Sequence, residues 1–144
     1  MDPIVEAITE PTFIVGSVEV APGDTSVEVP IYVVKSPALL SVVFNLTYDS
    51  EVMNLVECEG GDEDALSEFS FTKPKNLKSG CKFTWVTNDE TAVSDGLVVT
   101  LTFDILESET AGTYQISIAC VEDDTYNEAD YVTFEVINGV CTVE

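Results

Sequence analysis

The chain has 144 residues, of which 45% are apolar, so one domain can bury a packed core without help from a metal. Its 27 acidic and 5 basic side chains give a net charge of −22, which disfavours binding to nucleic acids and anionic membranes because both are polyanions. Histidine is absent, which excludes the hydrolase triads that depend on it and removes the commonest metal ligand.

The chain begins with a proline-flanked segment and a strand pair. Residues 1–11 are expected to form a linker or an edge extension, and the domain is expected to cover residues 12–144. Residues 13–20 and 25–34 alternate apolar with polar or small side chains around the turn sequence Ala-Pro-Gly-Asp, which predicts an antiparallel pair. Pro30 has no N–H to give to a ladder, so it predicts an edge position or a bulge.

Two further segments show strict alternation. In residues 39–48 the predicted core-facing side chains are Val42, Phe44, Leu46 and Tyr48, and the opposite side chains are Ser41, Val43, Asn45 and Thr47. In residues 81–87 the core-facing side chains are Cys81, Phe83 and Trp85, and the opposite ones are Lys82, Thr84 and Val86. Each segment is therefore predicted to be a strand with one buried face.

The remaining strands are short and are separated by turns. They are predicted at residues 52–58, 69–72, 96–106, 112–121 and 131–143, with acidic loops at 88–95, 107–111 and 122–130. No segment has a helical period of sufficient length. About nine short strands predict an all-β sandwich, because each half-polar sheet must bury one face against another.

The lysines and the cysteines are distributed unevenly. All lysines except Lys35 lie between residues 73 and 82, so this is the only basic region of the chain.

The cysteines Cys58, Cys81, Cys120 and Cys141 lack the short paired spacings of a zinc site. They are expected to be structural thiols or disulfides, and their pairing is left open.

Acidic residues cluster in three predicted loops, at 62–64, 89–90 and 122–124. Two carboxylates can hydrolyse a glycosidic bond, but 27 acids in 144 residues cluster by chance. The spacing of an EF-hand calcium loop is also absent. Solvated loops are therefore the favoured interpretation, and no catalytic or metal-binding residue is expected.

One predicted sheet face is neutral on an otherwise acidic chain. It carries Ser41, Val43, Asn45, Thr84 and Val86, where an ordinary solvent face should have more Glu and Lys. A mildly apolar surface with hydrogen-bonding side chains and an acidic rim is the composition expected of a protein docking surface. A face selected only for strand propensity would have the same composition.

The order of motifs along the chain resembles that of cohesin modules. The motifs are Pro22-Gly23-Asp24, Val27-Glu28-Val29-Pro30, Tyr48-Asp49, Val52-Met53-Asn54-Leu55, Phe83-Thr84-Trp85, a Gly-x-x-x-x-Leu-x-Phe strand at 96–103, and Asn138-Gly139-Val140. The resemblance covers the chain from about Thr12 to Val143. It implies a nine-stranded β-sandwich with jelly-roll topology.

The resemblance also implies a binding surface for a dockerin module on the third, fifth, sixth and eighth strands. The implied contact residues are Ser41, Val43, Asn45, Thr84, Val86 and Asn88, and the implied rim residues are Glu122, Asp123, Asp124 and Tyr126. Val43 and Asn45 are expected at the centre. The familiar charges of cohesins are missing at several of these positions, so a contact centre less polar than usual is expected.

By this resemblance the chain is a non-catalytic module of a cellulosome-type scaffold outside the cell, a monomer until it binds a dockerin. Calcium is expected on the dockerin and no cofactor on this chain. One alternative is a carbohydrate-binding module, although Trp85 points inward and Tyr126 and Tyr131 are few for a sugar-stacking face. The other alternative is an immunoglobulin-like spacer or adhesin domain, which fold analogy leaves open.

Overall fold

The computed structural model of the protein describes residues 10–60, 66, 68–106 and 111–144, except the side chain of Glu122. The predicted linker at 1–11 lies almost wholly outside these residues, as do the acidic cluster at 62–64 and most of the predicted loop at 107–111.

The described residues form eleven strands and one turn of 3-10 helix. The strands are β1 (Thr12–Val15), β2 (Val18–Val20), β3 (Val27–Val34), β4 (Leu39–Tyr48), β5 (Met53–Glu59), β6 (Ser70–Thr72), β7 (Cys81–Thr91), β8 (Gly96–Ile105), β9 (Gly112–Cys120), β10 (Glu135–Ile137) and β11 (Gly139–Val143), and the helical turn is η1 (Glu122–Asp124). The predicted all-β class is confirmed.

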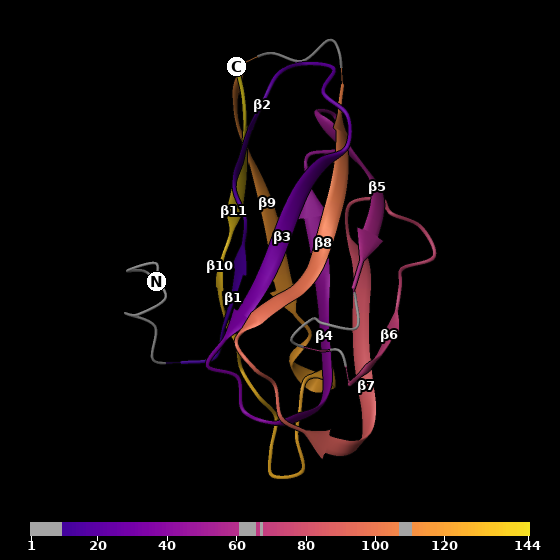
Figure 1. Cartoon of the computed structure of the whole chain (residues 1–144), viewed down its shortest axis with the longest axis vertical. Coiled ribbons are helices and arrows are strands. Elements are labelled where there is room, and N and C mark those ends of the chain that lie inside the picture. The colour runs from indigo at the N-terminus through magenta and orange to yellow at the C-terminus, as the bar shows by residue number, and fades with distance from the viewer. Residues whose placement is uncertain (1–9, 61–65, 67, 107–110) are drawn as a thin grey trace.

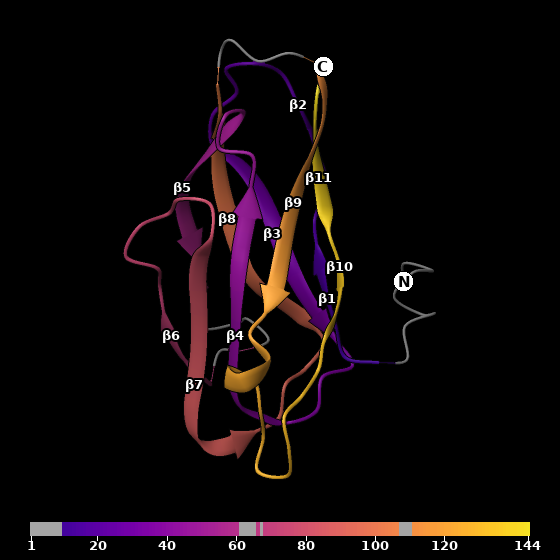
Figure 2. The ribbon, with the colours of Figure 1, turned by 180° about the vertical axis from the view of Figure 1, so that it is seen from behind.

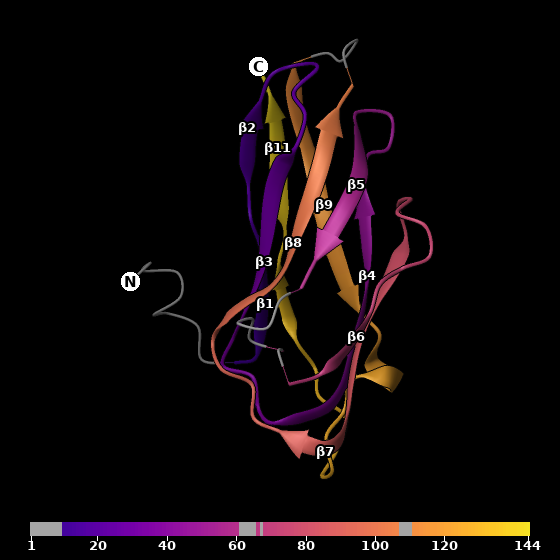
Figure 3. The ribbon, with the colours of Figure 1, turned by 45° about the vertical axis from the view of Figure 1, so that its right-hand side comes forward.

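The strands pack as two layers (Figure 1). A five-stranded sheet has the order β10-β1-β3-β8-β5, and a six-stranded sheet has the order β2-β11-β9-β4-β7-β6. Figure 2 shows the six-stranded sheet from its outer side, and Figure 3 shows the two layers obliquely. The arrangement agrees with the predicted jelly-roll sandwich.

Eleven strands replace the predicted nine because two predicted strands each divide between the sheets. In 13–20, β1 pairs with β3 and β2 pairs with β11. In 131–143, β10 pairs with β1 and β11 pairs with β9. Strands that switch sheets form the corners of such sandwiches. The predicted antiparallel pair is thus confirmed only for β1 with β3, since β2 pairs elsewhere.

Pro30 lies inside the five-stranded sheet and not at its edge, because β3 has β1 on one side and β8 on the other. The last β1 pair is Val15 with Ile31, and beyond it the N–H of Gly16 donates to the carbonyl of Pro30 at 2.8 Å. The register with β8 shifts between Ile31 and Tyr32. The extra residue at this shift is Val98, so the bulge lies in β8, opposite the proline's strand, and the proline is tolerated where β1 leaves the sheet.

The hydrophobic core lies between the two sheets. Trp85 is 2% exposed, and its ring stacks on Phe71 at a centroid distance of 4.5 Å. Phe44 lies 5.3 Å from the rings of both Phe83 and Trp85. The core-facing side chains predicted from the alternation in β4 and β7 are confirmed as buried.

The four cysteines are free thiols in this structure. Cys58, Cys81 and Cys141 are buried, and Cys120 is half-buried. Burial raises the pKa of each thiol, because a thiolate loses its hydration there. For Cys120 burial raises the pKa from 9.0 to about 12.

These thiols make the folded state sensitive to alkali. The unfolded chain releases the Cys120 proton near pH 9.0, whereas the folded chain holds it until about 12. The free energy of unfolding is therefore unaffected by this thiol at lower pH and is expected to fall above pH 9, by up to about 1.4 kcal/mol per pH unit. Urea unfolding of the wild type and of Cys120→Ala at pH 7 to 11 measures the difference. Equal alkaline slopes in the two proteins would contradict this prediction.

Candidate functional site

The strand register defines the outer face of the six-stranded sheet, because directly paired residues point to the same side. One row joins Ser70, Val86 and Ser41, and the next joins Thr72, Thr84 and Val43. A third joins Lys82, Asn45 and Ala119, and a fourth joins Thr47 and Ser117. Lys82 is the one charged residue in these rows.

We refer to the accessible neutral residues of these rows as the outer plateau. They are Asn45, Thr47, Ser70, Thr72, Thr84, Val86, Ser117 and Ala119. Val86 is 41% exposed, and Asn45 and Thr84 are half-buried. A neutral plateau of small side chains on a chain with a net charge of −22 is a surface that another protein can cover without burying charge.

Ser41 and Val43 are not part of this surface. Each is 4% exposed, so the expectation that they lie on an accessible face is wrong. The alternation placed both side chains correctly on the outer side of β4, but another segment covers that side.

The covering segment follows β9. The N–H of Val121 donates to the carbonyl of Val43 at 2.8 Å, and Tyr126 and Ser41 exchange backbone hydrogen bonds of 3.0 and 3.2 Å. Between these points the turn η1 bulges outward. The hydroxyl of Ser41 donates to the carbonyl of Asp124 at 2.7 Å, and the hydroxyl of Thr125 accepts from the N–H of Val43 at 3.2 Å. Ser41 and Val43 therefore support the segment that covers them.

The far end of β7 is longer than expected. The loop predicted at 88–95 begins only after Thr91, because Thr91 still pairs with Leu39 of β4. The register shifts between Leu39 and Ser41, and the extra residues of this bulge, within 87–90, lie on β7 and not on β4. The exposed Asn88 thus lies on a strand that continues from the plateau, and not in a loop.

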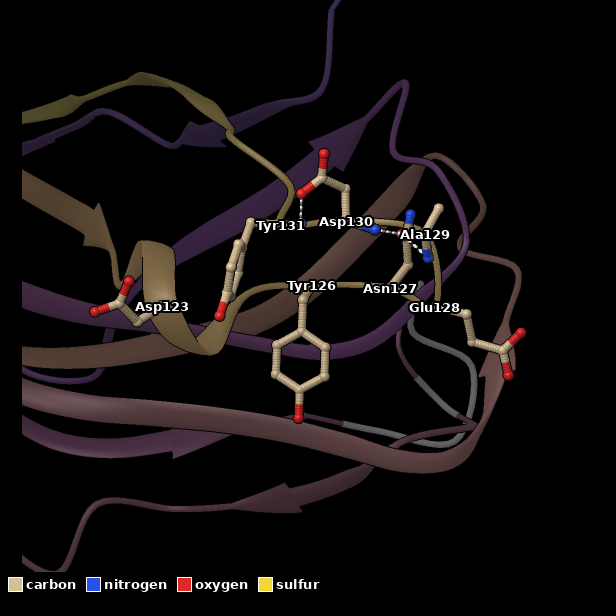
Figure 4. Close-up of a pocket in the computed structure, with 7 residues that line it drawn as sticks. All are labelled: Asp123, Tyr126, Asn127, Glu128, Ala129, Asp130 and Tyr131. Carbon is tan, nitrogen blue, oxygen red and sulfur yellow. Dashed lines mark hydrogen bonds between the residues drawn. The ribbon is translucent and has the colours of Figure 1, made fainter.

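A hydrogen-bonded turn closes the region beyond η1 (Figure 4). Tyr126 and Tyr131 form an antiparallel bridge. The side-chain oxygen of Asn127 accepts from the N–H groups of Ala129 and Asp130, each at 2.9 Å. The amide nitrogen of the same side chain donates to Ala38, which ties the turn to the chain before β4. We refer to residues 123–131 as the acidic hairpin.

The acidic hairpin forms a shallow pocket with two tyrosine rings. It is lined by Asp123, Tyr126, Asn127, Glu128, Ala129, Asp130 and Tyr131. The rings of Tyr126 and Tyr131 meet edge to face at 6.3 Å and are 37% and 64% exposed. The N–H of Glu128 donates to the carboxylate of Glu90, which joins the hairpin to β7. Exposed rings beside carboxylates can receive a cationic side chain.

The predicted rim residues Asp123, Asp124 and Tyr126 are exposed in this region, while the side chain of Glu122 lies outside the described residues. The residues of β6 and β9 on the plateau were not predicted. Alternation around Ile116 and Ile118 could have placed Ser117 and Ala119 on an outer face. Alternation does not indicate that β9 lies beside β4, but the implied surface on the third, fifth, sixth and eighth predicted strands had already put 112–121 and 39–48 in one sheet, as the structure shows.

Within the described ranges, no group of three or more His, Cys, Asp or Glu side chains could hold a metal ion. In the same ranges no helix could span a bilayer.

Comparison with known families decides the classification. The model of the cohesin domain matches residues 11–143. The chain belongs to the cohesin family. This family match agrees with the motif order and with the sandwich. Comparison with curated protein sequences found no match for this cohesin domain.

Solved structures share the fold at low sequence identity. A type I cohesin–dockerin complex from Clostridium thermocellum, Coh-OlpA with Doc918, is 21% identical, with 94% of this chain and 100% of that chain covered and a TM-score of 0.76. The seventh ScaB type I cohesin from Pseudobacteroides cellulosolvens is 23% identical, with 95% and 94% covered and a TM-score of 0.69. A non-cellulosomal cohesin from the archaeon Archaeoglobus fulgidus is 17% identical, with 94% and 92% covered and a TM-score of 0.75.

Proposed function

We propose that this cohesin domain is a non-catalytic docking module that binds a dockerin through the outer plateau. The dockerin would carry an enzyme or a further scaffold protein, and binding would add it to a cellulosome-type complex. The observation that carries the proposal is the outer plateau itself. Its residues are neutral and share the outer face of β4, β6, β7 and β9, with Lys82 as the one charged residue in the same rows, in a chain with a net charge of −22.

The proposed contacts differ in kind across the site. Asn45, Thr84, Val86 and Asn88 would touch the dockerin directly, because they are accessible on β4 and β7. Asp123, Asp124 and Tyr126, with Glu122 by its position in the sequence, would form the rim. Ser41 and Val43 would act from beneath, since they hold η1 in place. Central contacts of such interfaces supply most of the affinity, and rim charges set the association rate.

Calcium would be bound by the dockerin and not by this chain, which would need no cofactor and would be a monomer before binding. The module would work outside the cell on a secreted or surface-attached scaffold. The archaeal cohesin with the same fold is described as non-cellulosomal. The protein that carries the bound dockerin therefore decides whether the complex is a cellulosome.

Titration of this domain with a panel of calcium-loaded dockerins tests the proposal. We expect tight binding to at least one member and loss of that binding in excess chelator, because a dockerin folds around its calcium ions. If the domain binds no dockerin of a broad panel, the proposal is contradicted. A glycan array would then test the carbohydrate-binding alternative.

A further inference from the structure

Four of the five lysines lie at one end of the outer plateau. Lys73, Lys75 and Lys78 lie in the loop between β6 and β7, and Lys82 is the second residue of β7. All four side chains are exposed. The proposed contacts leave this basic region without a role.

Two of these lysines share a groove. Lys75 and Lys82 line it together with Thr72 and Thr84. Thr72 and Thr84 are also plateau residues, so the groove continues the plateau without a break. Lys82 pairs with Asn45, which places its side chain directly beside the plateau on β4.

The loop that carries Lys75 is anchored to β4. The hydroxyl of Tyr48 donates to the carbonyl of Leu77, and the N–H of Tyr48 donates to the hydroxyl of Ser79 at 3.0 Å. The N–H of Gly80 donates to the carbonyl of Leu46 at 2.6 Å. Leu77 also packs against the core. The lysine groove is therefore held in a defined position relative to the plateau.

The two ends of β7 carry opposite charge. Lys82 lies at its start, whereas Asp89 and Glu90 lie near its end, where Glu90 is bonded to the acidic hairpin. In Figure 2 the hairpin extends beyond the end of β7, and the β6–β7 loop lies at the opposite end of the strand. A protein that covers the plateau meets a cationic groove at one end and carboxylates at the other.

We propose that the lysine groove is the subsite for an acidic segment of the bound partner, and that it orients the partner along β7. This inference rests on the proposed dockerin binding. The partner's acidic segment lies over Lys75 and Lys82, and its basic side chains lie over the acidic hairpin. The reversed orientation would bring like charges together at both ends and is disfavoured.

Single charge reversals test the groove. The probe is the calcium-loaded dockerin that binds the wild-type domain most tightly. Lys75→Glu and Lys82→Glu are each expected to weaken binding about fivefold to tenfold, mainly by slowing association, and about 0.5 M salt is expected to remove most of the difference. Lys82→Arg keeps the charge and is expected to bind like the wild type.

Lys35→Glu is the matched control, because it makes the same charge change at an exposed position on the connection after β3 of the other sheet. It is expected to change affinity less than about twofold. If Lys75→Glu and Lys82→Glu weaken binding no more than Lys35→Glu does, the groove is not a subsite. If the wild-type domain binds no dockerin at all, the proposed function fails and this inference fails with it.

A paramagnetic label measures the orientation. A nitroxide attached beside the dockerin's most acidic segment is expected to broaden the amide signals of residues 73–80 and to leave those of 126–131 sharp. Broadening at 126–131, or equal broadening at both ends, would overturn the orientation even if the dockerin binds tightly.

Discussion

Val86→Asp is expected to weaken dockerin binding at least about tenfold while the domain stays folded. Val86 is the most apolar residue of the outer plateau and is 41% exposed, with Ser70 and Ser41 beside it on the neighbouring strands. A bound partner would remove water from an aspartate at this position without supplying a counter-charge, and an uncompensated buried charge is costly. The folded domain tolerates the change because the side chain is at the surface.

The chain offers a closely matched control for this prediction. Val56 in β5 is 42% exposed and lies on the five-stranded sheet, away from the plateau. Val56→Asp makes the same chemical change at the same exposure, so it is expected to leave dockerin binding unchanged. Titration calorimetry measures the affinities, and thermal unfolding checks that both variants are folded. Equal affinities for the two variants would place the interface elsewhere.

Gly139→Ala is expected to destabilise the domain by about 3 kcal/mol or more. A Cβ atom at this position would lie 2.1 Å from the carbonyl oxygen of Gly16 and 3.0 Å from a methyl group of Val15. The obstacle is mainly backbone, which cannot rotate away as a side chain can. Gly16 lies between β1 and β2, and Gly139 begins β11 just after β10, so both lie where the chain passes from one sheet to the other. The clash could be removed only by moving these two backbone segments apart.

Gly112→Ala serves as the control, because the three atoms nearest to its Cβ atom would all belong to the side chain of Tyr114, at 3.4 Å or more. This substitution also lies in the six-stranded sheet, in β9, and is expected to cost less than about 1 kcal/mol. Urea unfolding of the wild type and both variants gives the free energies of unfolding. If the two variants are equally stable, the close approach at Gly139 is not a constraint on the fold.

The altered roles of Ser41 and Val43 show where prediction from the sequence stops. Alternation along 39–48 correctly separated Val42 and Phe44 from Ser41 and Val43. It contains no information about the segment that follows β9, which is more than 70 residues away in the chain. Alternation also placed Asn45, Thr84 and Val86 on an accessible face. The resemblance implied that β6 and β9 share their sheet, and the register then identified the individual neighbours on those two strands.

Four properties follow from the amino-acid sequence: the all-β class, the core-facing side chains of β4 and β7, the acidity of the chain and, through the order of its motifs, the family. These properties depend on local alternation and composition, which each segment carries alone. Three further features are visible only in the folded chain: 13–20 and 131–143 divide between two sheets, Pro30 is internal, and η1 covers Val43. The alternation of side chains along a strand indicates to which side each side chain points. The alternation does not indicate which other strand pairs with that strand or which loop covers that side, because those contacts join residues far apart in the chain.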